Sequence, residues 1–256
     1  MFKSYVKERM RGTKLFKWEP DIDIIVAFAT LFIMWASCYG VMEIKWYYDS
    51  LISQIFLFVL LTTTFMAVIF PIWWIKSCRK QSLSELGITK KYLFASLIIS
   101  LGIAIWRGFD LIPYINELGW AFLLPTFISS ALIFWEPFFV FGWLQTRYEK
   151  VLGIIPAIFL AAASFLMYQV GSVTPEGLIN LFPVYLVLAS SFALTKNIFT
   201  IWPIYWCVGS SINQLSLGMS SDWGVAAVYV IALIIQFGSI FYFRNSPTSR
   251  RKKHQS

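Results

Sequence analysis

One carboxylate lies deep inside an apolar stretch of this 256-residue chain. Glu136 stands between Trp135 and Pro137, in a run of residues that is otherwise almost wholly apolar. Placing an ionised side chain at the centre of a bilayer costs about 2.5–3.5 kcal/mol on insertion scales, so such an acid is a functional candidate by default. The other acidic residues lie in loops or near the ends of apolar segments. The alternative is a carboxylate that reaches the membrane interface and pairs there with Arg147 or Lys150.

Pro137 predicts a local distortion beside this acid. Proline lacks a backbone donor and clashes with the carbonyl four residues back, so we expect a kinked helix with a freed carbonyl at Ile133. A kink beside a buried acid can form a polar pocket. Two residue pairs at one-turn spacing are candidates to line it. They are Phe165 with Gln169 and Gly209 with Asn213. Small and amide residues at such positions also serve as packing contacts between membrane helices.

The chain offers few groups for proton transfer or metal binding. Its single histidine, His254, lies two residues from the end of a hydrophilic tail. An amide such as that of Gln169 does not exchange protons near neutral pH, whereas imidazole does. Three cysteines stand far apart without a CxxC pattern, and a catalytic zinc typically needs three protein ligands. We therefore expect no metal and no cofactor.

Composition places these residues in a membrane protein. Hydrophobic residues make up 58% of the chain and charged residues 13%, against about 25% charged residues in a typical soluble domain. These values exclude a disordered chain, a nucleic-acid-binding module and an ordinary soluble enzyme, so we expect the lipid bilayer and no nucleic acid as partner. The prediction is an all-α, polytopic membrane helical bundle of about eight transmembrane helices. They are expected near residues 22–42, 51–75, 92–109, 119–141, 152–170, 178–194, 198–219 and 223–243.

Basic residues predict the orientation of this bundle. With eight crossings, every Lys and Arg except Lys45 and Arg107 falls on one side. By the positive-inside rule, that side is the cytoplasm and holds both termini. We expect an integral protein of a bacterial plasma membrane, with basic tails at residues 1–20 and 244–256. Without a long polar loop, residues 1–256 are predicted to form one integral membrane domain.

The residues from Glu136 to Lys150 resemble the signature of the CAAX-protease/bacteriocin-processing (CPBP, Abi) family. This family comprises intramembrane endopeptidases and lysostaphin-resistance-like proteins. Phe165 with Gln169 is similar to its second motif, a phenylalanine followed four residues later by histidine. Gly209 with Asn213 is similar to its third, a histidine followed four residues later by asparagine. The resemblance covers residues 119–215 and implies a CPBP-like core. It also implies that the first glutamate and the motif-two histidine activate water, and that the motif-three histidine and asparagine stabilise an oxyanion.

The chain departs from this pattern at four of the family's polar positions. Glu136 and Asn213 are retained as vestigial catalytic candidates. The second glutamate, the arginine and the two histidines of the family are replaced, in that order, by Pro137, Phe141, Gln169 and Gly209. These four residues and Phe165 are the expected cavity-lining equivalents of the motifs. Since both motif histidines are missing, the prediction leans against an enzyme.

Three hypotheses follow from the sequence. The first is a catalytically degenerate pseudo-protease, acting as a scaffold or regulator that binds a membrane protein or hydrophobic peptide, for example in bacteriocin immunity. The second is an active glutamate-dependent intramembrane endopeptidase of the CAAX or bacteriocin-processing type. The third is a transporter component, suggested by proline-broken helices.

Overall fold

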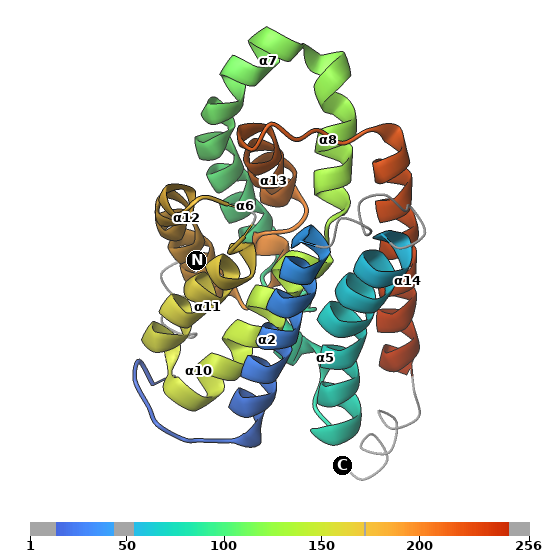
Figure 1. The fold of residues 1–256 in the computed structure, drawn as a ribbon. Helices are drawn as coiled ribbons and strands as arrows, with labels where there is room; N and C mark the ends of the chain where they lie inside the picture. The colour runs from blue at the N-terminus through green and yellow to red at the C-terminus, as the bar shows by residue number, and fades with distance from the viewer. Residues whose placement is uncertain (1–13, 44–53, 172, 246–256) are drawn as a thin grey trace.

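The computed structural model describes residues 14–43, 54–171 and 173–245, which form an all-α helical bundle without a β-sheet in those ranges (Figure 1). Helices satisfy every backbone donor and acceptor internally, as an apolar environment requires. The helical elements, in chain order, are α2 (Ile22–Glu43), η1 (Gln54–Ile69), α5 (Phe70–Trp73), η2 (Trp74–Cys78), η3 (Leu83–Leu86), α6 (Leu93–Gly108), η4 (Phe109–Leu111), α7 (Ile112–Leu118), α8 (Trp120–Leu132), α9 (Trp135–Pro137), η5 (Phe138–Gln145), α10 (Thr146–Leu152), α11 (Ile154–Gln169), α12 (Pro175–Thr195), η6 (Ile198–Thr200), α13 (Ile204–Ser216) and α14 (Trp223–Asn245).

Each of the eight predicted spans coincides with a helical segment, but the segments differ in length. Within the described residues, five are long and apolar enough to cross a membrane: 55–78, 93–118, 120–152, 175–195 and 223–244. Two shorter apolar helices cover Ile22–Cys38 and Ile154–Gln169. Helix α13 has only 13 residues, equivalent to about 20 Å, whereas the hydrocarbon core is about 30 Å thick. It therefore does not cross the bilayer alone as a straight helix.

The fourth predicted span, 119–141, is both longer and more interrupted than expected. Helical structure continues to Leu152, but it breaks at Ile133, whose φ of −71° and ψ of 88° are not helical. Pro137 then lies in the first turn of a new helix that starts at Trp135. The first-turn N–H groups of a helix have no intrahelical acceptor, so proline is tolerated there. The predicted kink is thus a complete break followed by a restart.

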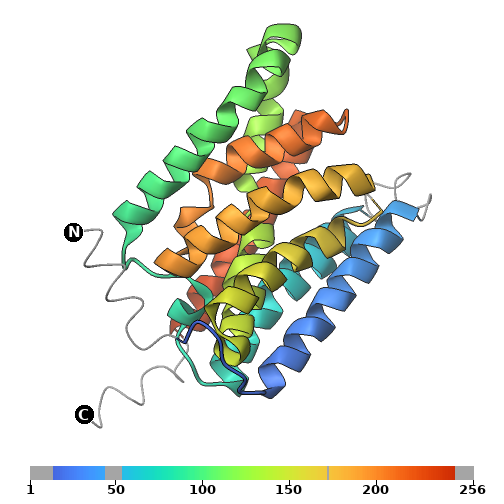
Figure 2. The same cartoon turned by 90° about the vertical axis from the view of Figure 1, so that its left-hand side faces the viewer.

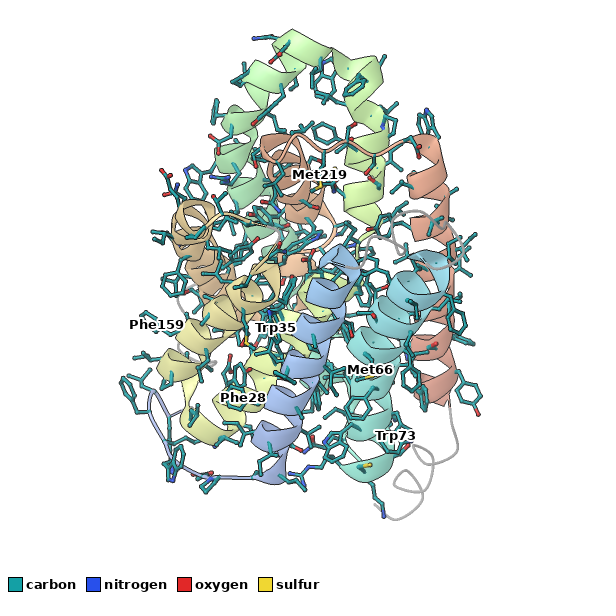
Figure 3. The ribbon with its side chains drawn as sticks, viewed as in Figure 1. Phe28, Trp35, Met66, Trp73, Phe159 and Met219 are labelled. Atoms are coloured by element: carbon teal, nitrogen blue, oxygen red, sulfur yellow. The ribbon has the colours of Figure 1, made fainter. Side chains whose placement is uncertain are left out.

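This restarted helix forms the centre of the bundle. All eight residues of η5 are buried, and six of them belong to a large apolar core with residues of α2, α11 and α12. Helix α11 packs along α10 and α12, α13 packs against α6 and α8, and α14 packs against α8 and η1 (Figure 2). Large apolar side chains cover the outside, as Trp73 and Phe159 illustrate (Figure 3). This arrangement matches a protein surrounded by lipid.

Within the described residues, several basic segments meet at one end of the bundle. The backbone N–H groups of Lys17 and Glu19 donate to the carbonyls of Leu152 and Val151. Asn197, next to Lys196, donates to the carbonyls of Thr89 and Lys91. Arg107, predicted on the other side, lies near α7, which Figure 1 places at the opposite end from α10.

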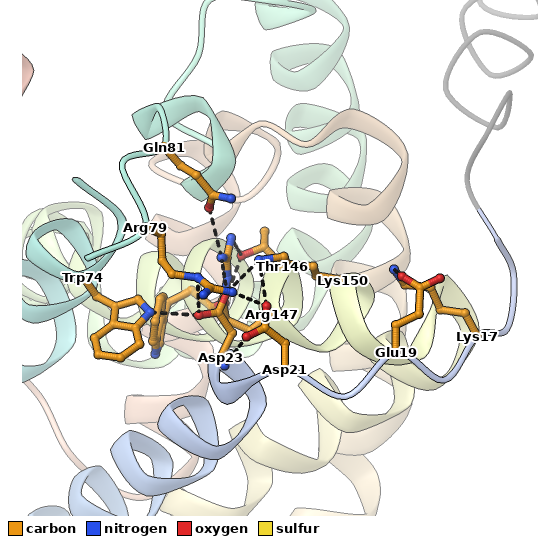
Figure 4. A network of polar contacts seen from close by, with 11 residues as sticks. Lys17, Glu19, Asp21, Asp23, Trp74, Arg79, Gln81, Thr146, Arg147 and Lys150 are labelled. Atoms are coloured by element: carbon orange, nitrogen blue, oxygen red, sulfur yellow. Dashed lines mark hydrogen bonds and ion pairs between the residues drawn. The ribbon is translucent and has the colours of Figure 1, made fainter. Parts of the chain in front are cut away.

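A buried ionic cluster holds this basic end together (Figure 4). Asp23, fully buried at the start of α2, lies 3.0 Å from nitrogens of Arg79, Arg147 and Lys150. Trp74 donates to the same carboxylate at 2.9 Å. Burial by itself raises the pKa of neighbouring Asp21, but Lys150 and Arg79 outweigh it and hold that pKa below its usual value. Arg147 and Lys150 therefore pair with aspartates of this cluster and not with Glu136, which corrects the interfacial alternative.

Candidate functional site

A cavity of about 160 Å³ contains most of the residues that the sequence singled out. Glu136, Phe165, Gln169, Gly209 and Asn213, which come from three separate helices, all line it. Pro137 and Phe141, which were expected to line it as well, do not. Phe141 is fully buried and packs on Phe192, with ring centroids 6.2 Å apart. We inferred its place in the cavity from motif spacing. The π-helical turns of η5 instead direct its side chain into the core.

Glu136 lies midway along the 33-residue stretch Trp120–Leu152, and its side chain is largely buried. A fourth span that ended at residue 141, as predicted from the sequence, would place Glu136 closer to the cytoplasmic end. Because the helix restarts at Trp135, Glu136 stands in the first helical turn, where the helix dipole favours a negative charge. Tyr168 and Gln169 donate hydrogen bonds to its Oε1, the latter at 3.3 Å. Both of these bonds are made to Oε1 and not to Oε2.

Aromatic rings form the walls around Glu136. Phe165 stacks on Tyr185 with ring centroids 3.7 Å apart. Trp206 meets Phe165 at an interplanar angle of 64° and Tyr205 at 71°. All four rings line the cavity and are buried. This wall of the cavity is therefore built from ring faces and edges.

Tyr205 occupies the space beside Gly209. A Cβ atom added to Gly209 would lie 2.6 Å from Tyr205 Cζ and 2.7 Å from its hydroxyl oxygen. These distances are far shorter than ordinary carbon contacts of about 3.5–4.0 Å. A ring from one turn earlier on α13 thus occupies the space that a side chain at position 209 would need. A histidine does not fit at position 209 without displacement of Tyr205.

Polar residues continue from Glu136 toward the surface. Ser210, Asn213 and the exposed Ser216 line the cavity along α13. Arg107 of α6 also lines it and forms an ion pair with Asp110 at 2.8 Å. The side-chain N–H of Trp206 is buried and lies near the Glu136 carboxylate. The cavity therefore combines one carboxylate, a buried indole donor and an arginine that is paired with an aspartate.

Sequence reasoning missed the aromatic and cationic part of this site. Tyr168 directly precedes Gln169 in the chain, and Tyr205 lies one turn before Gly209. Both could have been noted as polar aromatics next to motif positions. Arg107 was assigned only to topology, although an arginine outside the basic side was itself unusual. No feature of the sequence identified Tyr185 as a site residue, because it lies in an apolar helix with no motif residue nearby.

Within the described ranges, no group of three or more His, Cys, Asp or Glu side chains is arranged to hold a metal ion. Glu136 is the single member of these residue types among those that line the cavity.

Comparisons of the chain with protein-family models, with characterised proteins and with solved structures find no match. The geometry of the cavity and the composition of the chain therefore carry the functional argument.

Proposed function

We propose that this chain is a catalytically degenerate relative of the CPBP intramembrane endopeptidases that binds a hydrophobic peptide or a segment of a membrane protein in its cavity. The observation that supports this most directly is the convergence of five motif-equivalent positions, from Glu136 to Asn213, on one cavity. That convergence is what a retained binding cavity requires. The chemistry at those positions has changed, because no histidine lies within residues 1–253.

Two contacts oppose hydrolysis in this cavity. The Tyr168 hydroxyl donates to the Glu136 carboxylate, which stabilises it as an acceptor and weakens it as a base. Tyr205 fills the space at Gly209 where the third motif has a catalytic side chain. A general base must be able to take a proton from a positioned water and return it. The cavity keeps a shape suited to binding but lacks such a proton carrier.

The transporter hypothesis has one favourable feature, the helix break near the middle of the bundle at Ile133. Discontinuous helices form substrate sites in many transporters. However, the break is followed by η5, whose residues are all buried in the apolar core. This packed segment separates Glu136 from the ionic cluster at Arg147. The arrangement favours a closed pocket over a path through the bundle.

A proteolysis assay tests the catalytic part of the proposal. The full chain is reconstituted in liposomes and incubated with quenched fluorogenic peptides, with the Glu136→Gln variant as control. We expect the two proteins to give the same background signal, because neither has a proton carrier in the cavity. Cleavage by the wild-type protein that disappears in Glu136→Gln would instead establish the endopeptidase hypothesis.

Photo-crosslinking tests the binding part. A photoreactive phenylalanine analogue is introduced at Val184, which lines the cavity, or at Val187, which lies exposed on the same helix. In native membranes we expect a discrete covalent adduct of a peptide or membrane protein from position 184 but not from position 187. Competition by the purified peptide, once it is identified by mass spectrometry, should remove the adduct. Identical labelling from both positions, or none at 184, contradicts a bound occupant.

A further inference from the structure

The chemistry of the cavity wall indicates what kind of group enters it. Glu136 forms no ion pair with any cation within the described ranges, although it is largely buried. A buried carboxylate without a cationic partner is stabilised either by protonation or by a cation that binds beside it. A positively charged group on the occupant of the cavity would supply that cation.

The aromatic rings fit the same class of ligand. Phe165, Tyr185, Tyr205 and Trp206 line the same cavity as the Glu136 carboxylate. Cations are attracted to the negative faces of such rings, most strongly where water is excluded, and aromatic cages are a recurring way to bind ammonium groups. The near-perpendicular pairs of Trp206 with Phe165 and with Tyr205 give the cage more than one wall. Rings arranged in this way compensate part of the cost of desolvating a cation.

Arg107 does not prevent a cation from binding. Its guanidinium is paired with Asp110 at 2.8 Å, so the two side chains together carry no net charge. Asp110 is about half exposed and does not itself line the cavity. Glu136 is then the single uncompensated charge among the residues that line the cavity.

We propose that the cavity binds an organic ammonium group, with Glu136 Oε2 accepting an N–H and the four rings enclosing the adjoining carbons. The assignment rests on the proposed function, since it names the chemistry of that occupant: the amino terminus or a lysine side chain of the bound peptide. Size agrees with this class. A buried cavity of about 150 Å³ accommodates benzene, so about 160 Å³ accepts a branched alkylammonium group.

Calorimetric titration of the purified full chain in a maltoside detergent, which has no ammonium group, tests this assignment. The probes are isobutylammonium and isobutanol, which share a carbon skeleton and differ in charge. We expect isobutylammonium to bind at least about tenfold more tightly, the ratio that corresponds to the stronger end of cation–π and ion-pair contacts. Equal affinity for the two probes overturns the assignment.

Two pairs of variants test which residues account for the tighter binding of isobutylammonium. Glu136→Gln should reduce the affinity for isobutylammonium to that for isobutanol, whereas Glu117→Gln, on the exposed face of α7, should leave it unchanged. Tyr185→Leu should weaken binding several-fold, whereas Tyr185→Phe, which keeps the ring, should retain it. Thermal unfolding in the same detergent verifies that each variant is folded. If Glu136→Gln does not fold, the Tyr185 pair decides: equal affinities of Leu and Phe variants overturn the cage.

A competition experiment tests whether a peptide amino group binds at the same place as the isobutylammonium probe. A hydrophobic tripeptide with a free amino terminus should compete with isobutylammonium, and its acetylated form should not. If isobutylammonium does not bind while crosslinking at Val184 persists, the ammonium assignment is wrong and the binding function stands. If ammonium binding persists while crosslinking is absent, the proposed function is wrong instead.

Discussion

At the scale of single residues, Gln169 and Gly209 shape the site at the two positions where the proposed CPBP relationship would place histidines. Gln169 contributes a donor to the Glu136 carboxylate at 3.3 Å and so supports it without exchanging its proton. Gly209 contributes no side chain, and the ring of Tyr205 takes the space. Neither residue therefore supplies a proton carrier beside the carboxylate.

The Gly209 position gives a stability prediction. Gly209→Ala should lower the free energy of unfolding by about 1–3 kcal/mol, the usual cost of overpacking, because its Cβ would lie 2.6 Å from Tyr205 Cζ. Gly238→Ala on α14 is the matched control, since nothing lies within 4 Å of its added Cβ. Thermal unfolding in detergent measures both. An unchanged midpoint for Gly209→Ala would show that Tyr205 moves freely.

The close approach of Tyr205 to position 209 also predicts what happens when the motif histidines are introduced. Gly209→His together with Gln169→His should not create peptidase activity, because the imidazole at 209 meets the Tyr205 ring. Adding Tyr205→Ala should remove that obstacle. Fluorogenic peptide cleavage by the double and triple variants is the measurement. Activity in the double variant would show that the wall is adaptable.

At the scale of elements, the turn between α10 and α11 depends on the segment of residues 14–19 that precedes α2. The N–H groups of Ile154 and Ile155, at the start of α11, donate to the carbonyls of Lys14 and Leu15. Lys17 donates to the last residue of α10. The segment therefore satisfies backbone groups at both helix ends, which otherwise lack intrahelical partners. Its function is to fix the angle at which α11 presents Phe165 and Gln169.

Gly153 permits this approach. Its φ is +91°, and an added Cβ would lie 2.7 Å from the carbonyl oxygen of Leu15. Gly153→Ala should thus destabilise the protein by more than the roughly 1–3 kcal/mol that this positive-φ, extended backbone costs by itself. Gly119→Ala, with φ of +75° and nothing within 4 Å, isolates that backbone cost. Comparable melting-point losses in the two variants would contradict a role for the 14–19 segment.

At the scale of the whole molecule, two buried polar centres lie at different depths of one bundle. The ionic cluster at Asp23 ties α2, η2 and α10 together at the basic end. The cavity at Glu136 lies farther along the bundle and connects α9, α11, α12 and α13. The fully buried η5 separates the two. The bundle thus carries a charge-compensated cluster at its basic end and a polar cavity nearer its middle.

Asp23→Asn tests whether the ionic cluster stabilises the protein independently of binding in the cavity. Removing one partner of a buried ion pair leaves uncompensated charges and typically costs about 3–5 kcal/mol, and Arg147 beside Asp23 is almost fully buried. Glu19→Gln, which breaks an exposed pair with Lys14 and Lys17, should leave the melting temperature unchanged. Isobutylammonium affinity should be retained in Asp23→Asn at temperatures where it is folded. A small loss of stability would show that water reaches the cluster.

The sequence by itself determined the helical class, the positions of the eight apolar segments and the segregation of basic residues. These properties depend on composition and local order, because a lipid environment forces helices and favours charge at their ends. It also singled out Glu136, since an acid within an apolar run is visible without coordinates.

Tertiary structure alone decided which side chains face that acid and where other charges are buried. Asp23 looked like a residue at the end of a span, yet it meets Arg147, 124 residues away in the chain. Tyr168 donates to Glu136, which lies 32 residues away in the chain, and Phe141 is buried in the core. Such contacts join distant segments through shape and packing, which local patterns of hydrophobicity and charge do not encode.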